Sequence, residues 1–302
     1  MDTRAERIAS VGYDHAARVR YAVARCNLCG SDRLERVASR DRYGYPASAS
    51  GCARCSLVFL DPRMDTDGYA DFYAKWYRPI VSAYHGREIS AATLPADQRT
   101  YAASLCDWLS GELGTGAVAS LLDVGGSTGI VAAALRDRLG ARATVLDPSP
   151  EELEVAAGLG LDTAAGFVED YAPPAGTRFD LITLCQTADH LLDVASALAT
   201  IRELVADDGR FFVDIVDYLT VAENKGGLVE AIKVDHPYYF SDLTIRTALA
   251  RAGFRVVATR EAADQHLDYL CAPCERRPDA LPERADVEAA WRRIRAIAAA
   301  RG

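Results

Sequence analysis

The sequence predicts an α/β fold in which a doubly wound, Rossmann-like sheet follows a small cysteine-rich N-terminal module. From about residue 119 onward, short apolar runs alternate with stretches of helical periodicity, which is typical of a parallel sheet covered by helices on both faces. The first of these runs ends in a glycine-rich turn. Between residues 21 and 65, by contrast, Cys, Gly, Ser and Arg dominate. A core built from these residues is small and needs added stabilisation, such as a bound metal ion.

Strands and helices of the sheet region are expected in alternation. We expect strands over residues 119–124, 141–147, 179–185, 210–216, 254–261 and 265–272. Only a short connection within EAAD joins the last two strands, so they form a hairpin and make one strand at that edge antiparallel.

The helices between these strands carry recognisable start and stop signals. Residues 128–139 have apolar positions at helical spacing, and a second helix begins at Ser149, where Glu152 completes a capping box and Pro150 takes the first helical position. Residues 195–205 form a third helix. A fourth begins at the cap Ser241 and ends at Gly253.

These patterns divide the chain into five parts. We expect an N-terminal arm (1–20), the cysteine-rich module (21–65), an aromatic-rich helical linker (66–115), the sheet domain (116–275) and a C-terminal helix (276–302). The formal net charge of −9 argues against a nucleic-acid partner. Neither an export signal nor a membrane-spanning apolar run is evident, so we expect a cytoplasmic protein with reduced thiols.

Four cysteines of the N-terminal module predict a structural metal site. Cys26 and Cys29 form one CxxC turn, and Cys52 and Cys55 form another 22 residues later. Two such turns supply four thiolates in a tetrahedron, the spacing of a zinc ribbon. Iron is the competing metal, and free thiols or a redox pair are the alternatives without one. A third CxxC, at 271–274, has no partner pair and is interpreted as packing.

The glycine-rich turn predicts a ribose-bearing cofactor. Asp123 ends the first strand, and Gly125, Gly126 and Gly129 let a ligand approach the backbone closely. Asp147 ends the next strand, 18 residues past Gly129, where an acid takes both ribose hydroxyls. No Lys follows the glycines, which disfavours a P-loop. Alternatives are a turn with glycines for geometry only, and an NAD site.

The segment LLDVGGSTGI, which contains Asp123 and these glycines, resembles motif I of the class I methyltransferases. The segment TVLDPSP, which contains Asp147, resembles their acidic second motif. The resemblance covers residues 119–271 and implies a seven-stranded sheet that binds S-adenosylmethionine. It implies these places for the cofactor-binding residues: Asp123 near the methionine amino group, Gly125 and Gly126 under the cofactor with Ser127, Asp147 on the ribose, Phe167 and Val168 beside the adenine, and Gln186 near the methionine end. Ser127 departs from the Gly that the family often has there.

The module CNLCGS…GCARCSLVFLDPR resembles the N-terminal zinc domain of deoxysugar C-methyltransferases, which is joined to a class I fold. This implies a sugar acceptor, most plausibly nucleotide-linked. Those enzymes usually carry a further C-terminal domain, whereas this sequence ends about 30 residues after its last expected strand, which leaves the acceptor open.

Two histidines are candidates for the base that a methyl acceptor requires. His236 lies in VDHPYYFSD, which resembles the acid–His segment of the sugar C-methyltransferases and implies that Asp235 and His236 act together. The alternative is a His fixed in its loop by Pro237. His190 follows the strand 179–185 at the ligand-binding end of the sheet, where it acts as a base or only packs against the cofactor.

The sequence thus predicts a methyltransferase that uses S-adenosylmethionine and holds a structural zinc ion. Carbon and oxygen acceptors both need one base near the methyl group, so they are not distinguished. An NAD-dependent oxidoreductase and a non-catalytic zinc-ribbon binding protein are the alternatives, and the oligomeric state is left open.

Overall fold

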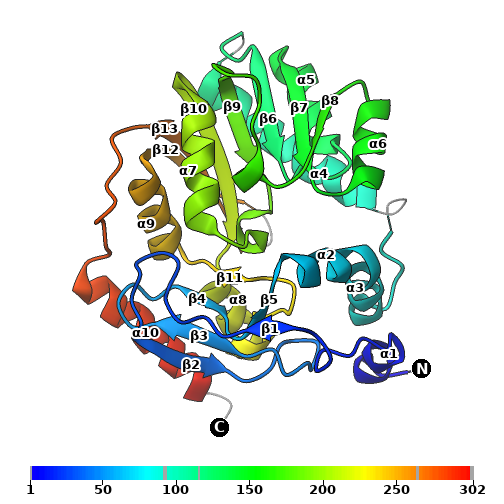
Figure 1. Ribbon diagram of the computed structural model, residues 1–302, viewed down its shortest axis with the longest axis vertical. Coiled ribbons are helices and arrows are strands. Elements are labelled where there is room, and N and C mark those ends of the chain that lie inside the picture. The colour runs from blue at the N-terminus through cyan, green and yellow to red at the C-terminus, as the bar shows by residue number, and fades with distance from the viewer. Residues whose placement is uncertain (1, 91–93, 115, 263–264, 300–302) are drawn as a thin grey trace.

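A computed structural model describes residues 2–90, 94–114, 116–262 and 265–299 of the chain. Its upper part in Figure 1 is a large sheet between two layers of helices, and its lower part contains the cysteine-rich module. The helix pair α2 (Thr66–Lys75) and α3 (Tyr77–His85) lies beside the module, below α6 (Pro150–Gly158).

The large sheet has seven strands in the order β12-β13-β10-β9-β6-β7-β8. Their bounds are β6 (Ser120–Val124), β7 (Arg142–Asp147), β8 (Asp162–Ala165), β9 (Phe179–Leu184), β10 (Val205–Val216), β12 (Phe254–Glu261) and β13 (His266–Pro273). The five strands from β10 to β8 pair in parallel, whereas β13 is antiparallel to both its neighbours. The predicted doubly wound fold with an antiparallel strand is therefore confirmed, and β12 is the outermost strand of the hairpin.

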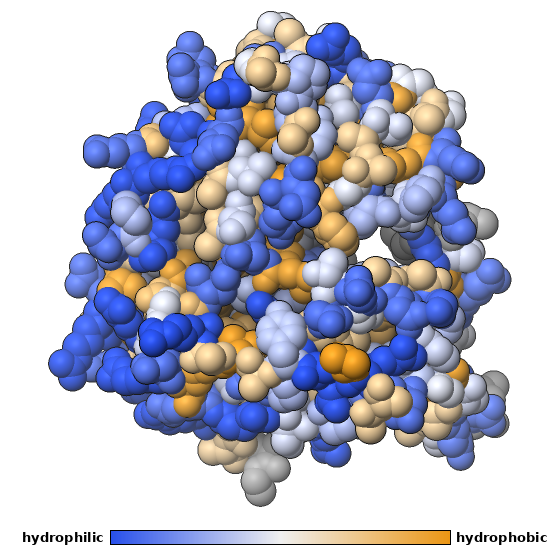
Figure 2. All heavy atoms as spheres, viewed as in Figure 1, coloured by the Kyte–Doolittle hydropathy of each residue, from blue (hydrophilic) through white to orange (hydrophobic). Residues whose placement is uncertain are grey.

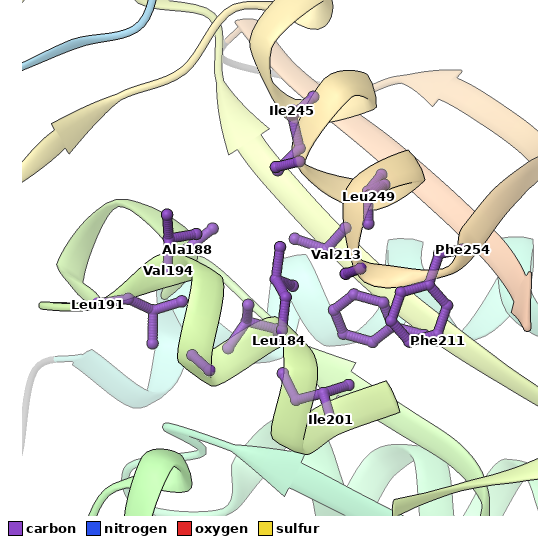
Figure 3. Packing of buried hydrophobic residues seen from close by; sticks show 14 of the residues in the cluster. Leu184, Ala188, Leu191, Val194, Ile201, Phe211, Val213, Ile245, Leu249 and Phe254 are labelled. Carbon is purple, nitrogen blue, oxygen red and sulfur yellow. The ribbon is translucent and has the colours of Figure 1, made fainter. Parts of the chain in front are cut away.

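Alternate residues of each strand pack against opposite layers of helices. On one face α7 (Val194–Leu204) and α9 (Asp242–Ala252) bury Leu184, Phe211 and Val213, as Figure 3 shows. On the other face α4 (Leu94–Leu113), α5 (Ile130–Leu139) and α6 bury Leu181 and Phe212. The carboxyl ends of the parallel strands therefore remain available for a site.

The cysteine-rich module forms a small antiparallel sheet, and one of its strands comes from much later in the sequence. Its order is β11-β4-β3-β2, formed by β2 (Leu34–Ala38), β3 (Ala49–Cys52), β4 (Val58–Leu60) and β11 (Tyr238–Tyr239). Residues 217–240 join β10 to the helix that begins after Ser241. That segment forms α8 (Tyr218–Lys225), a 3-10 turn over Leu228–Glu230, and β11.

Both ends of the chain also reach the lower part. Helix α1 (Arg4–Ser10) packs on α3, and the short strand β1 (Arg20–Tyr21) pairs with β5 (Arg63–Met64). Helix α10 (Arg284–Ala299) places Trp291 on the module, where its indole N–H donates to the carbonyl of Cys52. A Cβ built on Gly51 would lie 2.9 Å from the Trp291 ring, so the contact requires glycine there. Among the described helices, none has the length and apolarity to cross a bilayer.

Candidate active site and metal centre

The glycine-rich turn between β6 and α5 is closely packed from below. Gly125 has φ +67°, and a Cβ built there would lie 2.6 Å from the side chain of Thr187. A Cβ on Gly126 would lie 2.7 Å from Asp123 Oδ2. Neither position has room for a larger residue, so the glycines bring the backbone down onto the carboxyl end of the sheet.

The buried carboxylate of Asp123 shows whether the turn can accommodate a cationic group. Its carboxylate is fully buried at the end of β6, and Oδ1 accepts a hydrogen bond from Thr183 Oγ1 at 2.7 Å. Oδ2 has no partner among the described residues. Burial raises the pKa of Asp123 to about 7. A buried oxygen without a donor is costly, and a bound ammonium group would both satisfy and charge it. The methionine amino group of S-adenosylmethionine fits this requirement.

Asp147 and Ser127 shape the other side of the turn. Asp147 Oδ2 accepts the backbone N–H of Ser127 at 2.9 Å, and Oδ1 accepts that of Ser149 at 2.9 Å. Ser127 has φ +52°, which explains why glycine is favoured at this position. Its hydroxyl contacts Glu152, which also pairs with Arg78 of α3. The carboxylate oxygens of Asp147 keep further lone pairs, which suits two ribose hydroxyls.

The other cofactor residues expected from the sequence lie in three different environments. Phe167 is 40% exposed beside the 3-10 turn Val168–Asp170. The Val168 side chain is buried in the core with Leu146. Gln186 is exposed just beyond β9, in a left-handed conformation at φ +51°, and its N–H donates to Asp214 Oδ1. All three belong to loops that leave the carboxyl ends of β8 and β9.

Two Asp–His pairs that are far apart in the sequence form one cluster. His236 Nδ1 lies 2.5 Å from Asp189 Oδ2, and its Nε2 lies 3.3 Å from Asp235 Oδ2. The rings of His190 and His236 are 4.5 Å apart between centroids. Asp189 is two residues after Thr187, which supports Gly125, so the cluster adjoins the cofactor turn. The structure thus brings together Asp235, His236 and His190, and adds Asp189.

Asp189 gives His236 a defined protonation pattern. A carboxylate only accepts, so the Nδ1–H of His236 donates to Asp189 and Nε2 is the acceptor nitrogen, which faces Lys233 Nζ at 2.9 Å. Burial and the Lys233 ammonium disfavour the imidazolium, but the carboxylates of Asp189 and Asp235 outweigh them and raise the pKa of His236 above its ordinary value. Likewise, burial opposes the charge on Asp189, but His236 and His190 hold the pKa of Asp189 well below its usual range.

His190 differs from His236 in its partner and its charge. Its Nδ1 contacts the hydroxyl of Tyr73 on α2, and that hydroxyl donates to the backbone carbonyl of Asp235 at 2.8 Å. His190 Nδ1 is therefore the donor to Tyr73, which leaves Nε2 as an acceptor. Burial lowers the pKa of His190 to about 4, so this imidazole is neutral near pH 7.

Lys233 was not among the site residues predicted from the sequence, and neither was its proximity to the Asp235 carboxylate. Lys233 Nζ lies 2.9 Å from His236 Nε2. Asp235 is fully buried, and neither of its oxygens has a hydrogen-bond partner among the described residues. Asp189, His190 and His236 also offer three ligand-type atoms within 4.8 Å of one another. Because the Lys233 ammonium already supplies positive charge there, we propose no metal at this cluster.

The four cysteines predicted as metal ligands form one buried cluster. Their sulfur atoms lie within 4.8 Å of one another, with Cys26–Cys55 at 3.6 Å and Cys29–Cys52 at 3.5 Å. A tetrahedral zinc ion with bonds of about 2.3 Å separates its sulfurs by about 3.8 Å, close to these values. Gly30 and Ser56 take left-handed conformations after each second cysteine, so the two turns are alike. The residues present fit a structural ion.

Comparison with known proteins agrees with this geometry. A family model described as a methyltransferase domain matches residues 96–259, more than half of the chain. A ubiquinone biosynthesis O-methyltransferase of Methylobacterium sp. (strain 4-46) is 35% identical over 105 residues, which are 32% of this chain and 41% of that protein. One of Aeromonas salmonicida is 29% identical over 117 residues, 37% and 49% of the two chains. The chain thus aligns with less than half of these curated relatives.

Solved structures show the same fold at low sequence identity. An O-methyltransferase family protein from Burkholderia thailandensis has a TM-score of 0.50 at 16% identity, covering 60% of this chain and 59% of its own. A protein from Pyrococcus horikoshii also has a TM-score of 0.50, at 14% identity, covering 58% and 90%. The sheet order, the glycine turn and the family match lead to one conclusion: the chain belongs to the methyltransferase domain family of class I, S-adenosylmethionine-dependent enzymes.

Proposed function

We propose that this protein methylates an acceptor that must first lose a proton, and that His236 is the base. The observation that carries the proposal is the 2.5 Å contact between His236 Nδ1 and Asp189 Oδ2, next to the cofactor turn. A carboxylate on one imidazole nitrogen fixes the tautomer, strengthens the other nitrogen as a base and stabilises the imidazolium that forms. S-adenosylmethionine supplies an electrophilic methyl group when bound.

The charges around His236 suit removal of a proton from the acceptor. With Asp189 and Asp235 as carboxylates, Lys233 as ammonium and His236 protonated, the four groups sum to zero charge, so the protonated base is the balanced state. Lys233 Nζ lies 2.9 Å from Nε2. In this proposal its ammonium stabilises the negative charge left on the acceptor. In this proposal Asp123 and Asp147 bind the cofactor at the glycine turn, whose Gly125 packs against Thr187.

A nucleotide-linked sugar is the acceptor that we favour. Its support is the resemblance of the module and of the segment 234–241 to the deoxysugar C-methyltransferases, together with tyrosines beside the base. Tyr73 lies 5.7 Å from the His190 ring and 5.3 Å from the Tyr77 ring. Figure 2 shows the molecule hollowed between the sheet domain and the α2–α3 region that carries these tyrosines. Carbon and oxygen methylation need the same base.

A phenol is the second candidate acceptor, because the curated relatives are named ubiquinone biosynthesis O-methyltransferases. A phenol also loses a proton before it accepts a methyl group, so His236 serves both proposals. The NAD-dependent oxidoreductase considered from the sequence is not favoured, because the family match is to methyltransferases.

For the cysteine module we propose one structural zinc ion, held by Cys26, Cys29, Cys52 and Cys55. All four cysteines are buried and their sulfur atoms cluster together. An ion bound by all four has no open coordination position for catalysis.

Two experiments test the function. The zinc-loaded protein is incubated with S-adenosylmethionine and a panel of nucleotide-linked ketosugars, nucleotide sugars and catechols, and the products are screened by mass spectrometry for one added methyl group. Methyl gain on sugars alone supports the favoured acceptor, and gain on catechols alone supports the second. Undetectable binding of S-adenosylhomocysteine by calorimetry would contradict both.

A further inference from the structure

We propose that the cysteine module sets the distance between Asp189 and His236, and that Asn27 is the positioning residue through which its first CxxC turn acts on the Asp189 segment. The inference rests on the proposed role of His236. It goes beyond that role, because it assigns the module a task in catalysis rather than in stability alone.

The first attachment is made by Asn27, which lies between Cys26 and Cys29. Its Nδ2 donates to Asp193 Oδ1 at 2.9 Å, and its Oδ1 accepts the N–H of Ala195 at 3.2 Å. Asp193 is the N-cap of α7 and also accepts the N–H of Ser196. Asn27 thus completes the cap of the helix that begins just after the 3-10 turn Ala188–His190. Asn27 is therefore bonded both to the N-cap residue and to the first turn of α7.

A second attachment holds the residue between that turn and the cap. The carbonyl of Leu192 accepts hydrogen bonds from Arg63 at 3.0 Å and from the Tyr238 hydroxyl at 2.9 Å. Arg63 belongs to β5 of the module, and its guanidinium lies 5.0 Å from the centre of the Tyr238 ring. Ala188 and Leu191 anchor the same segment in the core, as Figure 3 shows.

The segment that carries His236 is attached to the module along its length. Tyr238 pairs with Phe59 across β11 and β4, and Leu60 N–H donates to the carbonyl of Pro237 at 3.0 Å. On the other side of His236, the N–H of Val234 donates to Asp41 Oδ2 at 2.9 Å. His236 therefore lies between two contacts with the module, two residues from one and one residue from the other.

The two attachments have one consequence for the site. Asp189 and His236 come from separate segments, each attached to a different part of the cysteine module, and their side chains are 2.5 Å apart. A displacement of about 1 Å in a catalytic group can lower the rate on the order of a hundredfold. The two CxxC turns fix the module, so in this proposal their geometry positions the base through Asn27 on one side and β4 on the other.

The test compares the full-length, zinc-loaded wild type with three variants. Asn27→Ala removes both bonds to α7. The double variant Asn27→Asp/Asp193→Asn exchanges donor and acceptor, so that the side-chain bond and the N-cap can both form again. Asn224→Ala is the matched control, because Asn224 is exposed on α8. The readouts are zinc per chain, affinity for S-adenosylhomocysteine, the titration of the His236 ring by NMR, and kcat and KM.

We expect Asn27→Ala to keep one zinc ion and the cofactor affinity, to move the pKa of His236 down toward its ordinary value, and to lower kcat by roughly tenfold to a hundredfold. The double variant should restore the titration and kcat, and Asn224→Ala should match the wild type. Asp189, Asp235, Lys233 and His190 face the His236 ring, and none of them is altered.

The proposal is overturned if the His236 titration in Asn27→Ala equals that of the wild type, or if the double variant folds without restoring it. It is also overturned if Asn27→Ala loses zinc, because Asn27 then serves the metal site instead. Should Asn27→Ala fail to fold, the double variant alone decides. A shifted His236 titration in a protein that methylates no acceptor would uphold the attachment and reject the proposed function.

Discussion

Replacing Asp189 by Asn tests the base directly, because the two side chains have nearly the same shape. The change removes the negative charge 2.5 Å from His236 Nδ1. An opposite charge at such a distance shifts a pKa by about 1–3 units, and each unit corresponds to about 1.4 kcal/mol. The variant therefore loses about 1.4–4 kcal/mol of stabilisation of the protonated base, which predicts a kcat lowered by roughly tenfold to a thousandfold.

The pH dependence of kcat in Asp189→Asn gives a second, independent test of the base, through the direction in which its acid limb moves. His236 must be neutral to accept a proton, so the rate of the wild type falls as the pH drops below its raised pKa. Without Asp189 that pKa falls, and the acid limb of the kcat profile should move to lower pH while the plateau drops. Rates are measured from pH 5 to 9, with Asp207→Asn at an exposed position as the matched control. An unchanged limb, or a limb moved to higher pH, would refute the assignment of His236.

Three further predictions concern the cofactor turn, the metal and the C-terminal helix. Because the pKa of Asp123 is raised to about 7, affinity for S-adenosylhomocysteine should increase from pH 6 to 8, by up to about tenfold per unit below the pKa. Asp123→Asn should bind more weakly, without this dependence, and a flat calorimetric profile in the wild type would exclude the assigned contact. Mass spectrometry of the native protein should show one zinc ion per chain, which Cys52→Ser loses together with thermal stability; a visible absorbance band would indicate iron instead. Trp291→Ala should cost about 3–5 kcal/mol in urea unfolding, and a cost below about 1 kcal/mol would show that α10 does not stabilise the module.

The sequence was a good guide wherever local pattern decides structure. The strands of the sheet domain, the caps Ser149 and Ser241, and the two CxxC turns are set by neighbours within a few residues, and the structure has them close to where they were expected. The resemblance implied seven strands, but the position of the short strand β8 was not predicted. Its residues Asp162–Ala165 lie at a sheet edge and are mostly exposed, so they lack the apolar run that marks a buried strand.

The candidate site was predicted less completely, because its contacts join distant segments. His236 was paired with its sequence neighbour Asp235, whereas the nearer carboxylate in the structure is that of Asp189. The repeated Asp–His dipeptide was a usable signal that the two segments meet. Nothing in the local sequence marks Asn27 as a cap for α7, or Lys233 as the neighbour of the His236 ring, since both contacts depend on tertiary packing. The roles of the cofactor residues and the sugar acceptor stay predictions.

The position of β11 in the module has a consequence for how the protein is made. The module is near the start of the chain, but its fourth strand comes from Tyr238–Tyr239, and Trp291 covers Gly51 from nearly the end. During synthesis, β4 therefore waits as an unpaired edge until most of the chain has left the ribosome. Such long-range pairings slow folding far more than they cost in equilibrium stability. Early metal capture would be the most direct protection for a nascent edge of this kind, and a chain shortened before residue 238 would leave it permanently exposed to aggregation.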